Sequence, residues 1–136
     1  FLTVALVVEG ANPFPDHWIY VHDPRVRLAR IQNYGNWSPG LIGRPGTTCL
    51  GLEYFCQEGD GLWALPDAEL LALGRRELGI LGLADPVAVS DGAVVRYEKA
   101  YPVYDPGYEE RVRTVREAVG GFANFQVIGR NGMHRY

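Results

Sequence analysis

The sequence predicts an α+β fold, with a mostly antiparallel sheet of five to six strands and two helices packed on one side. Segments with strand character dominate the first half of the chain, and two segments with helical periodicity follow. Short connections rich in Gly and Pro separate these segments. Because strands that follow one another closely usually pair with each other, the order favours antiparallel neighbours.

The first three predicted strands are residues 1–9, 17–22 and 26–34. Residues 1–9 are almost entirely apolar and β-branched, which is typical of a buried strand. Residues 17–22 are aromatic and β-branched, and residues 26–34 alternate between apolar and polar side chains. Asp23 and Pro24 turn the chain between these last two segments, which predicts a hairpin.

A loop is predicted over residues 36–46, which are rich in Gly and Pro. Residues 47–57 alternate again and predict a fourth strand. Cys49 and Cys56 are seven residues apart in this strand and therefore on opposite faces, so no disulfide between them is expected. Two free thiols indicate a reducing, cytoplasmic location.

The first predicted helix begins at Asp67, an expected cap, and stops at Gly82, with apolar residues at helical spacing between them. Residues 86–90 are expected to be short and extended. A turn at Asp91-Gly92 then leads into a strand over residues 93–100.

The second helix is expected to open at Asp105-Pro106 and to end at Gly120-Gly121. Its apolar residues recur at helical spacing over this stretch. A last strand is predicted over residues 124–128, followed by the polar segment 129–136.

Composition excludes several classes of protein. The net charge of −3 shows no general nucleic-acid footprint. No apolar run is long enough to span a membrane, and residues 1–8 lack the basic flank of a signal peptide. Because the chain begins with Phe1 and its single methionine is Met133, we expect one domain, residues 1–136, excised from a longer protein.

The motifs of several chemistries are missing. No Gly-x-Gly-x-x-Gly turn for a dinucleotide occurs, so the Rossmann half of a cofactor site is not in this sequence. The three histidines do not have metal-ligand spacing, and no metal site is predicted. Residues 43–48 contain glycines without a P-loop lysine and are interpreted as a plain loop.

Two clusters could form a site. Residues 30–39 place Arg, Gln, Asn and Tyr at a strand end, where a guanidinium could face a phosphate or carboxylate. Residues 97–105 and 129–136 gather tyrosines and cations near chain reversals. The residues alone leave the alternatives open, which are a solvated edge strand and a tyrosine-rich rim of the core.

The terminal segment GRNGMHRY, residues 129–136, resembles the start of the last flavin-contacting segment of the amine-oxidase-like flavoproteins, which include protoporphyrinogen oxidase and UDP-galactopyranose mutase. Residues 29–39 are similar to a mutase segment whose arginine meets substrate and flavin. Tyr101-Pro102-Val103 is similar to a Tyr-Pro-Val whose tyrosine helps to hold the substrate diphosphate. His134 stands where the mutase often has an aromatic residue, and this departure leaves the substrate open.

The resemblance implies a substrate-side domain that ends in the start of that flavin-contacting segment. FAD is expected in the full-length parent and none in the isolated chain. The expected partners are a small anionic or diphosphate-bearing substrate and the missing FAD-binding half, and no catalytic residue is assigned. The implied substrate-binding residues are Arg30, Asn33, Tyr101 and Tyr136, and the implied cofactor-binding residues are Gly129, Arg130, His134 and Tyr136.

Three functions follow. The first is the substrate-binding part of an FAD-dependent oxidoreductase of the amine oxidase or protoporphyrinogen oxidase type, inactive by itself, in which substrate hydride passes to the flavin. The second is a mutase-like flavoenzyme acting on a nucleotide sugar. The third, from a different class, is a small non-catalytic binding module.

Overall fold

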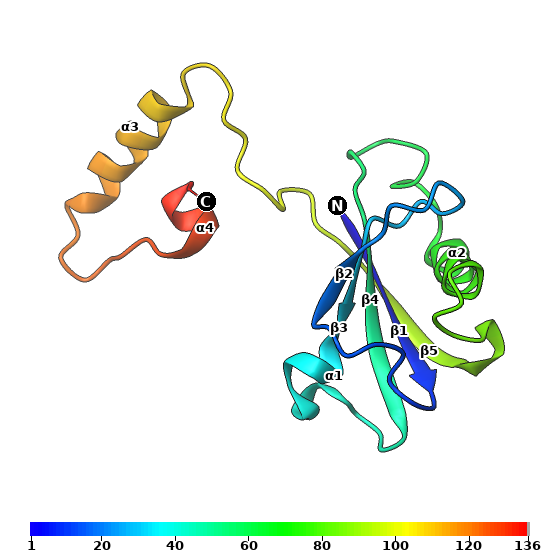
Figure 1. The fold of residues 1–136 in the computed structure, drawn as a ribbon. Helices are drawn as coiled ribbons and strands as arrows, with labels where there is room; N and C mark the ends of the chain where they lie inside the picture. Colours follow the sequence, from blue (N-terminus) through cyan, green and yellow to red (C-terminus); the bar gives the residue numbers. More distant parts are fainter. Residues whose placement is uncertain (136) are drawn as a thin grey trace. The chain divides into compact units, whose positions relative to one another are not determined.

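The computed structural model describes residues 1–135, and Tyr136 lies outside the described residues. The chain divides into two compact units, Phe1–Glu98 and Lys99–Tyr136. The first unit contains a five-stranded sheet and a long helix, and the second contains a linker and two further helices (Figure 1). The predicted α+β class is confirmed.

The sheet of the first unit is antiparallel at every pairing, and its strand order is β2-β3-β4-β1-β5. The apolar first strand lies inside the sheet, between two long partners, as its composition predicts. Strands at the centre of a sheet bury their backbone on both sides, which suits an apolar sequence. The strands are β1 Leu2–Glu9, β2 Trp18–Tyr20, β3 Arg30–Asn33, β4 Thr47–Tyr54 and β5 Val89–Arg96.

The core lies between one face of this sheet and helix α2, Asp67–Ile80 (Figure 1). Leu70 and Leu78 of the helix are fully buried there. Gly74 lets the helix approach closely, because a Cβ on it would lie 3.2 Å from Val4 Cγ1. The sheet therefore has one apolar face covered by α2 and a second face with a different composition.

A buried carboxylate joins α2 to the sheet. Glu77 is almost fully buried and accepts hydrogen bonds from the backbone N–H groups of Arg27, at 2.8 Å, and Leu28, at 3.2 Å. The hydroxyl of Tyr54 donates to the same carboxylate at 2.9 Å. Burial, followed by the charge of Glu77, raises the pKa of Tyr54.

This carboxylate also explains a difference from the prediction. The third strand, predicted over residues 26–34, is observed only as Arg30–Asn33. Arg27 and Leu28 give their N–H groups to Glu77 instead of to a strand ladder. The predicted loop over residues 36–46 contains the end of a short helix, α1 Tyr34–Trp37, and all of a second one, η1 Pro39–Leu41.

The predicted turn at Asp91-Gly92 is wrong, since both residues lie inside β5. Gly92 is required by packing, because a Cβ there would lie 2.7 Å from Leu71 Cδ2 of the helix and 2.9 Å from the carbonyl oxygen of Ala5. The segment before it, predicted as extended, contains the short helix η2 Pro86–Ala88. Asp67 is the first residue of α2 rather than its cap, and it pairs with Arg96.

The second unit contains helix α3, Tyr108–Gly120, and the short helix α4, Gly129–Met133. The end of α3 at Gly120-Gly121 is as predicted, and its start lies two residues after Pro106. The predicted strand over residues 124–128 is wrong. No other strand occurs in residues 99–135, so a strand there would have no ladder partner for its backbone groups.

Candidate functional site

The sheet face opposite α2 carries polar side chains from the neighbouring strands β3 and β4. Arg30 and Gln32 of β3 point to this face, whereas Ile31 between them is fully buried in the core. The register of β3 and β4 places Arg30 opposite Glu53 and Gln32 opposite Gly51. We call this surface the polar face.

An ion pair between Arg30 and Glu53 lies at one end of the polar face, where β3 begins and β4 ends. The Arg30 Nε donates to Glu53 Oε2, and Gln32 Nε2 donates to the other carboxylate oxygen at 3.1 Å. The two charged side chains are only 19% and 8% exposed. The guanidinium also lies 5.6 Å from the ring centre of Tyr20. Glu53 therefore fixes the plane of a cation that still reaches the surface.

Tyr34, at the start of α1, covers the neighbouring row of the polar face. Its phenol rests on Gly51, and any larger residue at position 51 would collide with the ring. Burial, with smaller contributions from Cys49 and Glu53, raises the pKa of this hydroxyl. Ala5 and Ala93 continue the same row across β1 and β5, so small residues form the middle of the face.

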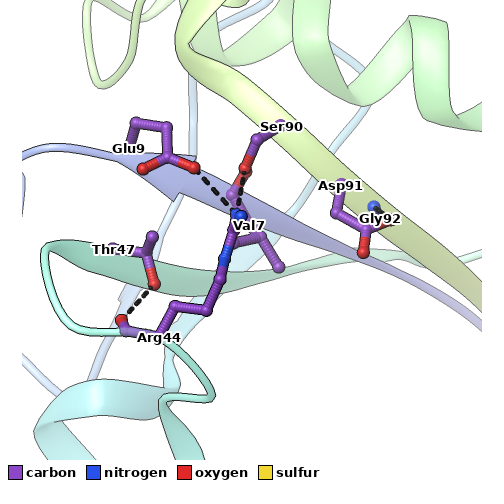
Figure 2. A network of polar contacts seen from close by, with 7 residues as sticks. All are labelled: Val7, Glu9, Arg44, Thr47, Ser90, Asp91 and Gly92. Atoms are coloured by element: carbon purple, nitrogen blue, oxygen red, sulfur yellow. Dashed lines mark hydrogen bonds and ion pairs between the residues drawn. The ribbon is translucent and has the colours of Figure 1, made fainter.

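A second arginine lies at the other end of the polar face, on the loop before β4. Arg44 Nη2 donates to Glu9 Oε1 and to Ser90 Oγ, both at 2.8 Å (Figure 2). Next to it is a cavity of about 280 Å³, whose walls include Val7, Leu41, Arg44, Cys49 and Asp91. The interpretation of residues 43–48 as a plain loop was therefore incomplete, because Arg44 of this loop contacts Glu9 of β1 and Ser90 of β5.

Asn33, a predicted substrate-binding residue, lies on the core side. It is fully buried, and its Nδ2 donates to Asn12 Oδ1 and to the carbonyl oxygen of Phe14. Thr48 Oγ1 lies 3.5 Å from its Oδ1. These partners give Asn33 the role of holding residues 12–14 on the sheet, so it is not included in the polar face.

The second unit brings together most of the other predicted residues. The Arg130 guanidinium lies 5.0 Å from the ring centre of Tyr101. His134 Nε2 lies 3.3 Å from the carbonyl oxygen of Val103, and its ring is 5.8 Å from that of Tyr104. A cavity of about 870 Å³ is lined by Tyr101, His134 and their neighbours in this unit. Tyr136, assigned to both substrate and cofactor, lies outside the described residues.

The structure thus places the predicted residues in two groups. Arg30 belongs to the first unit, and Tyr101, Gly129, Arg130 and His134 belong to the second. Sequence reasoning missed Glu53 and Arg44. The sequence does carry a signal for Glu53. It is the one acidic residue among the alternating apolar residues of β4, and the alternation places it on the same face as Arg30.

Neither a metal cluster nor a membrane helix is found in the described part of the chain. Residues 1–135 contain no group of three His, Cys, Asp or Glu side chains that could hold a metal ion. None of their helices is both long and apolar enough to cross a bilayer. Cys49 and Cys56 are free thiols, and burial raises the pKa of Cys49.

The chain matches no protein-family model and no curated protein. Its fold is similar to solved structures, among them one described as the crystal structure of reduced UDP-galactopyranose mutase. The TM-score is 0.72 at 18% sequence identity, over 99% of this chain and 28% of that chain. At this identity the similarity shows the fold, and the chain spans only 28% of the length of the mutase.

Proposed function

We propose that this chain is the substrate-side part of an FAD-dependent enzyme, and that the polar face forms one wall of its substrate site. The observation that carries the proposal is the Arg30–Glu53 pair, a fixed cation next to the row of small residues formed by Gly51, Ala5 and Ala93. The similarity of the fold to a part of the mutase supports it. The FAD-binding part would belong to the same protein, outside this sequence.

Arg30 would hold the anionic group of the substrate. A guanidinium binds phosphate or carboxylate oxygens through paired N–H groups, and it does so best when its plane is fixed beforehand. Glu53 and Gln32 supply that fixation from within the sheet. The anion would therefore meet a cation that loses little conformational entropy on binding.

The residues of the second unit fit one edge of a flavin. Arg130 offers a cation beside Tyr101, and His134 offers an imidazole beside Val103 and Tyr104. Such donors suit an anionic or carbonyl-bearing ring edge. The FAD-binding part outside this sequence would hold the phosphates of the cofactor. When bound, FAD would supply the redox chemistry, and this chain would bind and orient the substrate.

Our first candidate is an oxidoreductase. The second candidate is a mutase acting on a nucleotide sugar, and the fold similarity to the mutase supports it. The two differ in electron balance. An oxidoreductase consumes or produces reducing equivalents with every turnover, whereas an isomerisation such as the mutase reaction leaves none over. Counting the electrons transferred per product formed separates them.

The test uses the complete protein encoded by the gene. We expect it to purify with FAD, and we expect inorganic pyrophosphate to perturb the flavin absorbance. Arg30→Ala should weaken pyrophosphate binding at least about tenfold, since one charge-assisted contact contributes roughly 1.5–3 kcal/mol. Arg76→Ala, an exposed arginine of α2 on the opposite side of the sheet, is the matched control and should retain most of the affinity. A complete protein without flavin would overturn the proposal in favour of a binding module, and unchanged pyrophosphate binding in Arg30→Ala would overturn the role of Arg30.

A further inference from the structure

Three large aromatic side chains are exposed at the β2 edge of the polar face, beside Arg30. Trp18 is 43% exposed, Trp37 51% and Tyr20 57%. Single exposed apolar residues are common on protein surfaces. Two indoles and a phenol on one edge instead form a contiguous exposed apolar patch. Such a surface generally serves recognition.

The indoles are held in place without being buried. The rings of Trp18 and Trp37 stack with their centres 5.4 Å apart and their planes 11° from parallel. The ring of His17 meets Trp37 edge-on at 5.0 Å. The Nε1–H of Trp37 donates to Gln32 Oε1 at 3.1 Å. The stack is therefore ordered before any ligand arrives, which lowers the entropic cost of binding.

The strand register sets the distance from the stack to the cation. Trp18 lies opposite Gln32, and Tyr20 lies opposite Arg30. Gln32 and Arg30 are two residues apart on the same face, which corresponds to roughly 7 Å along a strand. A ligand that reaches both places must therefore carry a flat ring and an anionic group joined by a short link.

We propose that the Trp18–Trp37 stack is a subsite for a planar aromatic or heteroaromatic ring carried by the same anionic substrate. A flat ring extends a stack of near-parallel indoles with full face contact, whereas a puckered ring touches it only with its axial hydrogens. The charge of Arg30 beside the stack selects an anionic ligand over a neutral apolar partner. This inference rests on the proposed anion-binding role of Arg30, and the experiment separates the two.

The experiment compares two ligands of equal charge on the 136-residue chain. Phenyl phosphate has a planar ring, and cyclohexyl phosphate has a puckered ring of similar size. Binding is followed by the NMR shift of the Trp37 indole N–H. We expect phenyl phosphate to bind about tenfold more tightly, within the range measured for stacking of one ring on an aromatic side chain.

The variants assign this preference. Trp18→Leu keeps an apolar side chain and should reduce the preference for phenyl phosphate to less than twofold. Trp37→Leu should reduce the preference by a similar amount, and its binding is followed by the NMR shift of the Trp18 indole N–H. Trp63→Phe, a tryptophan packed against the core, is the matched control and should leave it intact. Arg30→Ala should weaken both ligands equally. If Arg30→Ala binds both ligands as tightly as the original chain does, Arg30 does not bind the anion, and the stacking subsite is unaffected by that result. Equal affinities for the two ligands, no binding of either one, or a preference that survives Trp18→Leu would overturn the subsite.

Discussion

At the scale of single residues, the polar face depends on how charge is buried. Arg30 and Glu53 form a pair that is largely shielded from water, whereas Arg44 and Glu9 are 58% and 48% exposed. Exposed ion pairs contribute little because water and salt screen them. A shielded pair with further hydrogen bonds couples its members more strongly, and removing one member leaves a buried charge without its counterion.

A double-mutant cycle checks this difference. Arg30→Met and Glu53→Gln, alone and together, should give a coupling free energy of about 1–3 kcal/mol in urea unfolding. The same cycle with Arg44→Met and Glu9→Gln should give about 0.5 kcal/mol or less. Equal coupling in the two cycles would show that Glu53 does not hold Arg30 in solution.

A second prediction at this scale concerns acid. The hydrogen bonds from the Arg25 side chain, and then from its backbone N–H, lower the pKa of Asp23 from 3.8 to about 2. Because the folded-state pKa is lowered, the stabilisation is complete above pH 3.8 and is lost as the pH falls toward 2. An NMR titration should show the low pKa in the native chain. In Arg25→Met the pKa should rise toward 3.8, though only in part, since the backbone N–H at position 25 still donates.

At the scale of elements, α2 decides which sheet face becomes the core. Leu70 and Leu78 provide its apolar contact, and Gly74 and Gly92 allow helix and strand to approach closely. Glu77 adds a specific polar connection to residues 27 and 28, just before β3. Through this connection the helix on the apolar face also positions the strand that carries Arg30 on the other face.

Glu77→Gln tests the connection with an isosteric change. A glutamine has only one acceptor oxygen for three donors, so at least one buried donor loses its partner. We expect a loss of about 2–3 kcal/mol in the free energy of unfolding. Glu69→Gln, on the exposed first turn of the same helix, should cost less than about 1 kcal/mol. A Glu77→Gln variant as stable as Glu69→Gln would exclude a structural role for the buried carboxylate.

At the scale of the whole molecule, the two units are stabilised by different kinds of contact. Among residues 1–135, all strands and every buried apolar side chain of the core belong to Phe1–Glu98. Helix α3 has no buried residue, and the described part of the second unit is held by contacts such as Arg130 with Tyr101 and Arg116 with the carbonyl oxygen of Met133. The first unit should therefore fold without the second.

Lysyl endopeptidase tests this with a single cut. Lys99 is the one lysine of the sequence, it is exposed, and it is the first residue of the second unit. We expect rapid cleavage there, followed by a stable fragment 1–99 with the β-sheet circular dichroism and the cooperative unfolding of the intact chain. Loss of cooperative unfolding on cleavage would show that the sheet needs the second unit.

The sequence by itself determined the α+β class, most strands and both long helices, because these depend on local periodicity. It also singled out Arg30 as a candidate anion-binding residue from its chemistry, and that role stays a prediction. It failed at Gly92 and at residues 124–128. The turn signal at Gly92 and the short segment with strand character at 124–128 depend on distant neighbours that the local sequence does not reveal. Gly92 serves the approach of Leu71, and residues 124–128 lack a strand to pair with. Only the tertiary structure shows that Glu53 pairs with Arg30 and that Asn33 is buried on the core side. It also shows that Arg44, on the loop before β4, pairs with Glu9 of β1. Each of these depends on register and chain reversal, which bring together residues far apart in the sequence.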